Sequence, residues 1–231
     1  MIDWKSIRAA VFDLDGTLID SARIWQEVDE TFFARRGMAV PDGYAEEIAH
    51  LGFAESAALT VQRYFPRENA ADIIEEWREL SLSRYKAEEG ARYFKPGAVQ
   101  LVSRMRAAGL RLCVATASSP EFFLPILRAG GVESLFDAFV TVADAGKNKS
   151  FPDIFLQSAQ RLGVSPAACA VFEDNGRALV AAKQAGMHTC AVYDGQPEAA
   201  WSAICADADL VLYDLRRCGP FAAESDETMR P

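Results

Sequence analysis

The sequence predicts an α/β fold, a doubly wound parallel sheet with an inserted α-helical cap domain. The first observation is a series of six short, continuous apolar runs, a pattern typical of parallel strands buried on both faces. The second is the alternation of these runs with helix-like stretches from residue 97 onward. The third is a block of helical periodicity that separates the first run from the others. With 231 residues, of which 50% are hydrophobic, the chain can bury a substantial core.

The runs that we expect to form strands are 9–13, 110–116, 137–142, 168–173, 188–192 and 209–213. The stretches that we expect to cover the sheet as helices are 98–109, 121–131, 153–163 and 178–186. Apolar residues recur at helical spacing in the first of these stretches, and Gly109 is its expected C-cap. Folds of this class bind ligands beyond the carboxyl ends of their strands, so functional residues are expected there.

The helical block spans residues 20–93 and consists of successive amphipathic patterns. Because it lies between the first strand and the rest of the α/β unit, we expect it to be a cap domain. The core domain then consists of residues 1–19 and 94–218. The polar segment 219–231 is expected to be a disordered tail.

Charge and composition exclude several classes of protein. The formal net charge of −9 argues against non-specific binding to nucleic acid or to an anionic membrane, because both need a basic surface. The N-terminus lacks a signal-peptide pattern, and no apolar stretch approaches the roughly 18 residues of a membrane span. Three of the five cysteines, Cys113, Cys169 and Cys190, lie in apolar strand runs, where cysteine is usually a small core residue. We expect a reduced, cytoplasmic protein that is a monomer without nucleic-acid or membrane partners.

Acidic side chains follow two of the predicted strands. Asp13 and Asp15 end the first run, and residues two apart in an extended segment face the same side. Glu173 and Asp174 end the fourth run. Carboxylates that converge at one edge of a sheet are suited to Mg²⁺, a hard cation that prefers oxygen ligands.

Groups suited to an anion follow the other strands. Thr116 and Ser118 offer short hydroxyls beside backbone N–H groups, and Lys147 and Lys149 follow the third run. Two like charges about 4 Å apart repel by ~1 kcal/mol in water and by ~4 kcal/mol at an effective dielectric constant of 20. A phosphate dianion therefore reaches Asp13 only with compensation, which Mg²⁺ and one lysine would supply. These residues predict a metal-assisted site for a small phosphorylated metabolite.

Four segments in order and spacing resemble the motifs of the haloacid dehalogenase (HAD) superfamily. They are "DLDGT", Thr116 after an apolar strand, "KSFPDIF" and "FEDNGRALVAAKQAGM". The insertion after the first motif resembles the C1 helical cap of that superfamily, and the chain as a whole is most similar to its β-phosphoglucomutase-like phosphatases. The resemblance covers residues 7–215 and implies a Rossmannoid core.

The resemblance implies a role for each acidic residue of the first motif. Asp13 would be the nucleophile that attacks phosphorus and forms an aspartyl-phosphate. Asp15 would be the general acid, which protonates the leaving alcohol, and then the general base, which activates water. The carboxylates of Asp13 and Asp174 and the backbone carbonyl of Asp15 would hold Mg²⁺.

The other motifs are expected to bind the phosphoryl group and to support the metal ligands. Thr116, with the backbone around Ala117 and Ser118, would hold the transferring group, and Lys149 would neutralise it and orient the nucleophile. Glu173 would support the metal ligands from behind or bind the metal through a water molecule. Asn175 occupies a position where the family commonly has a small hydroxyl, so it is expected to alter the hydrogen bonding around the metal.

Several nearby polar residues have a structural interpretation. Asp20, together with Ser21, is expected to cap the first cap helix. Lys147 is expected on the surface, because Lys149 alone has the spacing of the family motif. Asp153 is expected to cap the helix that follows it.

The leading interpretation is a Mg²⁺-dependent phosphatase that acts on a sugar phosphate. One alternative is a phosphomutase, but Trp25 and Glu55 stand where known β-phosphoglucomutases have a histidine and a phosphate-binding arginine. A phosphonate hydrolase would need a lysine early in the cap, and residues 20–60 contain none. A dehalogenase would lack the acid at Asp15. A catalytically weak binding or regulatory protein is the remaining alternative.

Overall fold

The computed structural model describes residues 2–48, 53–86 and 88–222. Six parallel strands form one sheet in the order β3-β2-β1-β4-β5-β6. The strands are β1 (Ala9–Phe12), β2 (Arg111–Thr116), β3 (Ala138–Thr141), β4 (Cys169–Glu173), β5 (His188–Val192) and β6 (Leu210–Leu212). Each predicted run forms one of these strands, and the predicted fold class is confirmed.

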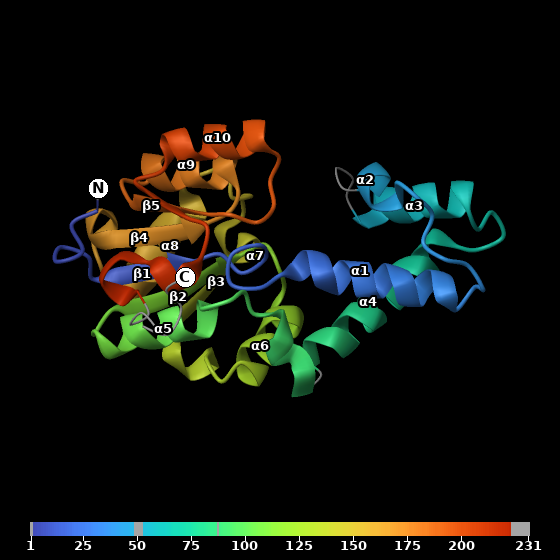
Figure 1. The fold of residues 1–231 in the computed structure, drawn as a ribbon, viewed down its shortest axis with the longest axis horizontal. Helices are drawn as coiled ribbons and strands as arrows, with labels where there is room; N and C mark the ends of the chain where they lie inside the picture. Colours follow the sequence, from blue (N-terminus) through green and yellow to red (C-terminus); the bar gives the residue numbers. More distant parts are fainter. Residues whose placement is uncertain (1, 49–52, 87, 223–231) are drawn as a thin grey trace, which may run out of the picture.

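Helices cover both faces of the sheet (Figure 1). The core helices are α5 (Ala98–Ala107), α6 (Pro120–Ala129), α7 (Val142–Ala145), α8 (Asp153–Leu162), α9 (Gly176–Gln184) and α10 (Glu198–Asp207). Because side chains alternate along a strand, Ala10 and Phe12 of β1 pack into one core cluster with α5 and α6. Ala9 and Val11 pack into a second cluster with α8 and α9. The continuous apolar run of β1 is thereby buried on both sides.

Helix α5 ends one residue earlier than the sequence predicts. Ala108 is its C-cap, and Gly109 follows with φ +86°, a left-handed conformation that glycine adopts without steric cost. Helix α10, which the sequence analysis did not predict, packs on α9 through Trp201, Leu179 and Ile204.

The cap helices lie to one side of the sheet (Figure 1). The segment before α1 and the segment after α4 connect them to it. They are α1 (Ser21–Ala34), α2 (Tyr44–Ile48), α3 (Phe53–Arg63) and α4 (Ala70–Lys86), followed by the 3-10 helix η1 (Glu88–Tyr93). Val28, Phe32 and Trp77 belong to a hydrophobic cluster that is separate from both core clusters. Asp20 is the N-cap of α1 and accepts a hydrogen bond from the Arg23 N–H (3.1 Å), as predicted.

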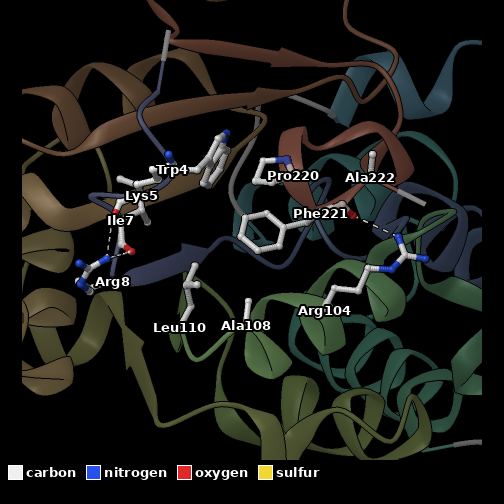
Figure 2. A pocket seen from close by; sticks show the side chains of 10 residues that line it. All are labelled: Trp4, Lys5, Ile7, Arg8, Arg104, Ala108, Leu110, Pro220, Phe221 and Ala222. Atoms are coloured by element: carbon white, nitrogen blue, oxygen red, sulfur yellow. Dashed lines mark hydrogen bonds between the residues drawn. The ribbon is translucent and has the colours of Figure 1, made fainter. Parts of the chain in front are cut away.

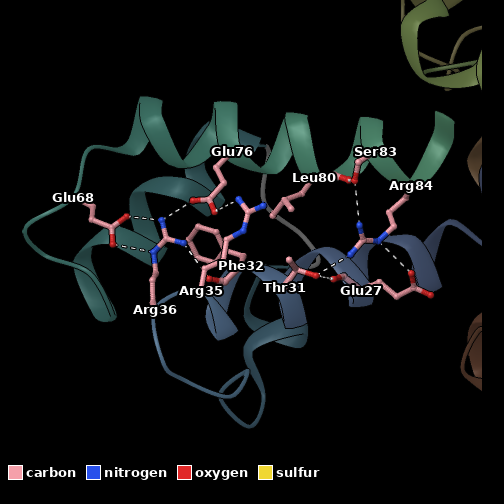
Figure 3. Close-up of polar contacts among 10 residues, drawn as sticks. All are labelled: Glu27, Thr31, Phe32, Arg35, Arg36, Glu68, Glu76, Leu80, Ser83 and Arg84. Atoms are coloured by element: carbon pink, nitrogen blue, oxygen red, sulfur yellow. Dashed lines mark hydrogen bonds and ion pairs between the residues drawn. The ribbon is translucent and has the colours of Figure 1, made fainter. Parts of the chain in front are cut away.

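Ion pairs join the two long helices of the cap (Figure 3). Arg36 donates to the carboxylates of Glu68 and Glu76, at 2.7 Å in each case, and its guanidinium lies 3.7 Å from the centroid of the Phe32 ring. The Arg36 side chain is only 17% exposed. Such a partly buried, multiply bonded arginine holds the segment after α1 against α4 and the residues before it more firmly than an exposed pair would.

The C-terminal part of the described chain packs on the core. The 3-10 helices η4 (Leu215–Arg217) and η5 (Gly219–Phe221) follow β6. Phe221 is buried, and its ring meets the Trp4 ring edge-on with the ring centroids 5.3 Å apart. The chain therefore remains folded beyond residue 218, where the sequence predicts the start of a disordered tail; residues 223–231 lie outside the described residues.

A cavity of about 910 Å³ lies beside Phe221 and next to the residues that precede β1 and β2 (Figure 2). Arg104 lines one side of it and donates to the Phe221 carbonyl oxygen (3.1 Å). This cavity lies at the amino ends of the strands, away from the predicted site.

All five cysteines are free thiols. Within the described part of the chain, no helix is both long enough and apolar enough to cross a membrane.

Candidate active site

The loop after β1 holds the first motif rigidly at the carboxyl edge of the sheet. The Asp13 N–H donates to the Phe172 carbonyl oxygen of β4 (2.9 Å), which extends the sheet by one residue. The Gly16 N–H donates to the Ile19 carbonyl oxygen (2.9 Å), and Gly16 has φ +80°. A Cβ atom at Gly16 would lie 2.6 Å from Oδ2 of Asp174, so glycine is needed for this close approach.

Three carboxylates converge beyond β1 and β4. One oxygen from each of Asp13, Glu173 and Asp174 lies within 4.8 Å of the others. Asp13 and Glu173 are buried, and Asp174 is half-buried. The sequence placed these residues at strand ends, and the parallel register of β1 with β4 brings them together.

Lys149 is the cation of this cluster. Its Nζ donates to Asp13 and, at 2.7 Å, to Glu173. Lys147 instead lies on the surface and pairs with Asp153 at 3.0 Å. Asp153 is the first residue of α8 and Pro152 is the N-cap, so the predicted capping role of Asp153 is wrong.

One lysine does not balance three carboxylates. Burial, with the charge of Glu173, raises the pKa of Asp13 to about 7. Burial, with the charges of neighbouring carboxylates, likewise raises the pKa values of Glu173 and Asp174 to about 7. Burial alone would lower the pKa of Lys149, but Asp13 and Glu173 outweigh it and raise that pKa. The cluster is therefore deficient in positive charge.

Asp15 points toward the cap side of the site. Its carboxylate accepts a hydrogen bond from the Ser118 hydroxyl (2.7 Å) and a longer one from the Tyr85 hydroxyl (3.5 Å). Burial and the neighbouring Asp15 raise the pKa of Tyr85, so its phenol stays protonated and acts as a donor. Tyr85 belongs to the cap helix α4, which thus contacts the first motif directly.

The loop between β2 and α6 carries the predicted phosphate-binding residues. Thr116 is buried, and its Oγ1 accepts a hydrogen bond from the Ser118 N–H (2.9 Å). Because Oγ1 is the acceptor there, its own proton is available to an oxygen of a ligand. Ala117 is exposed and lines the cavity beside Asp15.

Glu173 and Asn175 are fixed by hydrogen bonds within the core. One oxygen of Glu173 binds Lys149, and the other accepts from the Asn175 N–H (3.2 Å). The side chain of Asn175 caps α9, accepting from the N–H groups of Arg177 (2.9 Å) and Ala178 (3.3 Å). Asn175 thus reaches the acidic cluster through its backbone, whereas the sequence analysis expected its side chain to act there.

Two residues that the sequence analysis missed hold the first motif in place. Lys95 donates from Nζ to the carbonyl oxygens of Gly16 and Tyr193 and to the carboxylate of Asp194, each at 2.7 Å. Asp194 follows β5, so the strand-end argument applied to the first and fourth strands would have found it. Lys95 follows the return from the cap, where nothing in the local sequence signals its role.

A cavity of about 460 Å³ lies between core and cap beside Asp15. Its lining residues are Asp15, Ser21, Trp25, Phe53, Ile74, Arg78, Tyr85, Ala117, Ser118, Ser119 and Phe122. The cap therefore places the guanidinium of Arg78 at this cavity. The sequence analysis considered only Trp25 and Glu55 as cap residues that could face the substrate. Arg78 pairs with Glu121 of the core helix α6 and with Glu75 (3.0 Å).

Comparison with known proteins identifies the family of the chain. A sequence model of haloacid dehalogenase-like hydrolases matches residues 7–186. The chain belongs to this family. The resemblance inferred from the four motifs is thereby confirmed.

Several relatives of this haloacid dehalogenase-like hydrolase are phosphatases by name. Hexitol phosphatase A of Escherichia coli (strain K12) is 30% identical over 186 residues, which are 79% of this chain and 81% of that protein. A protein described as a probable pseudouridine-5′-phosphatase of Drosophila melanogaster is 28% identical over 199 residues, 82% of this chain and 83% of that protein.

Solved structures share the fold across core and cap. CbbY from Rhodobacter sphaeroides, in complex with phosphate, superposes with a TM-score of 0.70 at 26% identity, covering 92% of this chain and 96% of that chain. The β-phosphoglucomutase from Clostridium difficile superposes with a TM-score of 0.66 at 23% identity, covering 90% of this chain and 92% of that chain.

Proposed function

We propose that this hydrolase of phosphoric monoesters is a Mg²⁺-dependent phosphatase that cleaves a small sugar phosphate through an aspartyl-phosphate. The observation that carries the proposal is the pair Asp13 and Asp15, with Asp13 bound by Lys149 at the acidic cluster and Asp15 beside the cavity. The named activities of the relatives, among them a hexitol phosphatase, support this substrate class. The phosphate in the CbbY complex supports phosphate binding at this fold.

The donor set of the acidic cluster fits Mg²⁺. All of its candidate ligands are oxygens, and burial together with neighbouring carboxylates raises the pKa values of Asp13 and Asp174, an effect that a bound cation would offset. Asp13, Asp174 and the backbone carbonyl of Asp15 would hold the ion. Glu173, whose oxygens bind Lys149 and the Asn175 N–H, would not bind the ion directly but would hold Lys149 in place beside Asp13. Bound Mg²⁺ would offset the charge of the phosphate and orient it.

The two aspartates divide the chemistry of the first step. A carboxylate oxygen of Asp13 attacks phosphorus, and the bond from phosphorus to the leaving oxygen breaks. Asp15, in its protonated form, gives its proton to the leaving oxygen, so that an alcohol departs. Lys149 and the Thr116 hydroxyl stabilise charge on the transferring group.

In the second step water replaces the alcohol. Asp15, now a carboxylate, accepts a proton from water as the water oxygen attacks phosphorus. The bond from phosphorus to Asp13 breaks, inorganic phosphate leaves and the free carboxylate of Asp13 is restored. The hydrogen bonds from Ser118 and Tyr85 keep Asp15 in place through both steps.

The presence of Arg78 in the cavity is the observation that favours a phosphomutase as a second candidate, because a mutase binds a second phosphate through the cap. However, Glu121 and Glu75 already neutralise this guanidinium. We therefore expect a hexose 1-phosphate to yield inorganic phosphate even when a sugar bisphosphate is added. Accumulation of an isomeric monophosphate, measured by ³¹P NMR, would instead identify a mutase.

The nucleophile assignment is tested with Asp13→Asn. The amide is nearly isosteric with the carboxylate but is a poor nucleophile, so hydrolysis of p-nitrophenyl phosphate with Mg²⁺ should fall to background. Circular dichroism should show an intact fold. Activity within tenfold of the wild-type protein would contradict the covalent route.

A further inference from the structure

We propose that the substrate's leaving group carries a planar ring, and that Trp25 and Phe53 of the cap bind this ring by stacking. This inference rests on the proposed phosphatase function and narrows its substrate class. The ligand chemistry is that of a pentose phosphate bearing a heterocycle, as in a nucleoside 5′-monophosphate.

Because the cavity lies beside Asp15, we expect the leaving group of the substrate to occupy it. Asp15, the proposed acid that protonates the leaving oxygen, lines it, as do Ala117 and Ser118 of the proposed phosphate-binding loop. Whatever is attached to the transferring phosphate on the side of Asp15 must therefore enter this space. Its volume of about 460 Å³ falls within the range of about 300–1,000 Å³ that is typical of small-molecule sites.

The walls of the cavity are rich in aromatic rings. The rings of Trp25 on α1 and Phe53 on α3 meet edge-on with centroids 5.5 Å apart. The rings of Tyr85 on α4 and Phe122 on α6 meet edge-on at 5.6 Å, one from the cap and one from the core. Four of the eleven lining residues are therefore aromatic. Phe53 also meets the Trp77 ring edge-on, with centroids 5.6 Å apart, and is still 43% exposed, so part of its ring remains accessible.

Two of the polar side chains that line the cavity, Ser118 and Arg78, are already bonded to other residues. A buried sugar alcohol needs a partner for each hydroxyl that leaves water, because an unpaired polar group is costly. The Ser118 hydroxyl already donates to Asp15. Arg78 is bound by Glu121 and Glu75, which also disfavours a second phosphate there. A flat ring instead presents its π face, which aromatic walls bind without requiring a hydrogen-bond partner for every atom.

The test compares phosphomonoesters with and without a ring. The ring-bearing substrates are uridine 5′-monophosphate, adenosine 5′-monophosphate and pyridoxal 5′-phosphate. The ring-free leaving groups are supplied by sorbitol 6-phosphate and glycerol 3-phosphate, and ribose 5-phosphate supplies the sugar alone. We expect kcat/KM for the best ring-bearing substrate to exceed kcat/KM for each of the three substrates without an aromatic ring by at least tenfold.

Variants assign the effect to the stacking residues. Stacking of one base is worth about 1–3 kcal/mol, so Trp25→Ala should lower kcat/KM for the ring-bearing substrate about 5- to 150-fold. The same variant should keep kcat/KM for ribose 5-phosphate within twofold of the wild-type value. Trp25→Phe should restore most of the loss for the ring-bearing substrate. Trp4→Ala is the matched control, because Trp4 lines the cavity at the opposite end of the sheet and should leave the ratio of the two substrates unchanged.

The outcomes separate this inference from the proposed function. Hydrolysis that favours a polyol phosphate, or a Trp25→Ala variant that slows both classes equally, would overturn the ring proposal and leave the phosphatase standing. Failure to hydrolyse any of these esters or p-nitrophenyl phosphate would overturn the proposed function itself.

Discussion

Replacing Gly16 by alanine tests how closely the first motif is fitted to the acidic cluster. Gly16 has φ +80°, and a Cβ atom there would lie 2.6 Å from Oδ2 of Asp174 and 2.8 Å from Oδ2 of Asp194. Real Cβ atoms essentially never come closer than 3.0 Å to another heavy atom, so the Gly16 backbone and the Asp174 carboxylate must move apart by at least 0.4 Å, the difference between 3.0 and 2.6 Å. Asp174 is a proposed ligand of Mg²⁺, so this movement affects metal binding.

The magnitude follows from two separate costs. An alanine in the left-handed region costs about 1–2 kcal/mol of stability. A catalytic group displaced by about 1 Å costs about 10²-fold in rate, so a displacement of about 0.4 Å should cost about tenfold. We therefore expect Gly16→Ala to raise the Mg²⁺ concentration for half-maximal activity about tenfold and to lower kcat to a similar degree.

The assay is a Mg²⁺ titration of p-nitrophenyl phosphate hydrolysis, with thermal unfolding measured in parallel. Gly109→Ala is the matched control, because Gly109 has φ +86° but no atom lies within 4 Å of its Cβ position. Both variants should lose similar stability, and only Gly16→Ala should shift the Mg²⁺ titration. Half-maximal Mg²⁺ concentrations within twofold of each other in the two variants would refute the close-contact argument.

Three further predictions concern charge. Lys149→Met should lower kcat at least 10²-fold in the same assay, because it removes a preorganised cation, whereas Lys147→Met should leave kcat within twofold; the reverse result would show that the wrong lysine was assigned. Arg36→Met should lower the free energy of unfolding by about 2 kcal/mol in urea titrations, because it removes the arginine that both Glu68 and Glu76 bind and leaves the partly buried Glu76 with Arg35 alone. The more exposed Arg35→Met should cost less than about 0.5 kcal/mol, and equal losses would contradict this account. Burial raises the pKa of Asp29 from 3.8 to about 7, so the folded state retains a proton that the unfolded state loses as the pH rises between these values. Stability should fall across that window, and Asp29→Asn should remove this part of the fall, worth about 1–2 kcal/mol above pH 7 after solvent screening. Melting temperatures of the two proteins that run parallel from pH 4 to 8 would contradict the shift.

The sequence alone determined the architecture and the charged groups that meet at the candidate site. Strands buried on both faces need continuous apolar runs, and amphipathic helices need a period of 3.6 residues, so both leave local patterns that are read directly. The carboxyl ends of parallel strands share one edge of the sheet, so Asp13, Asp174 and Lys149 could be assigned to one site before any contact was known. The sequence also indicated Lys149 over Lys147, and the structure brings only Lys149 to Asp13.

Only the tertiary structure decided which residues support and surround that site. Tyr85 reaches Asp15 across 70 positions of sequence, and Lys95 reaches Asp194 across 99. Neither contact has a local pattern, because each depends on how the cap and the loops return to the sheet. The aromatic walls of the cavity were equally hidden, since an aromatic residue on an amphipathic helix indicates only burial. Sequence periodicity specifies which face of an element is buried, whereas the packing of one element on another specifies what that face meets.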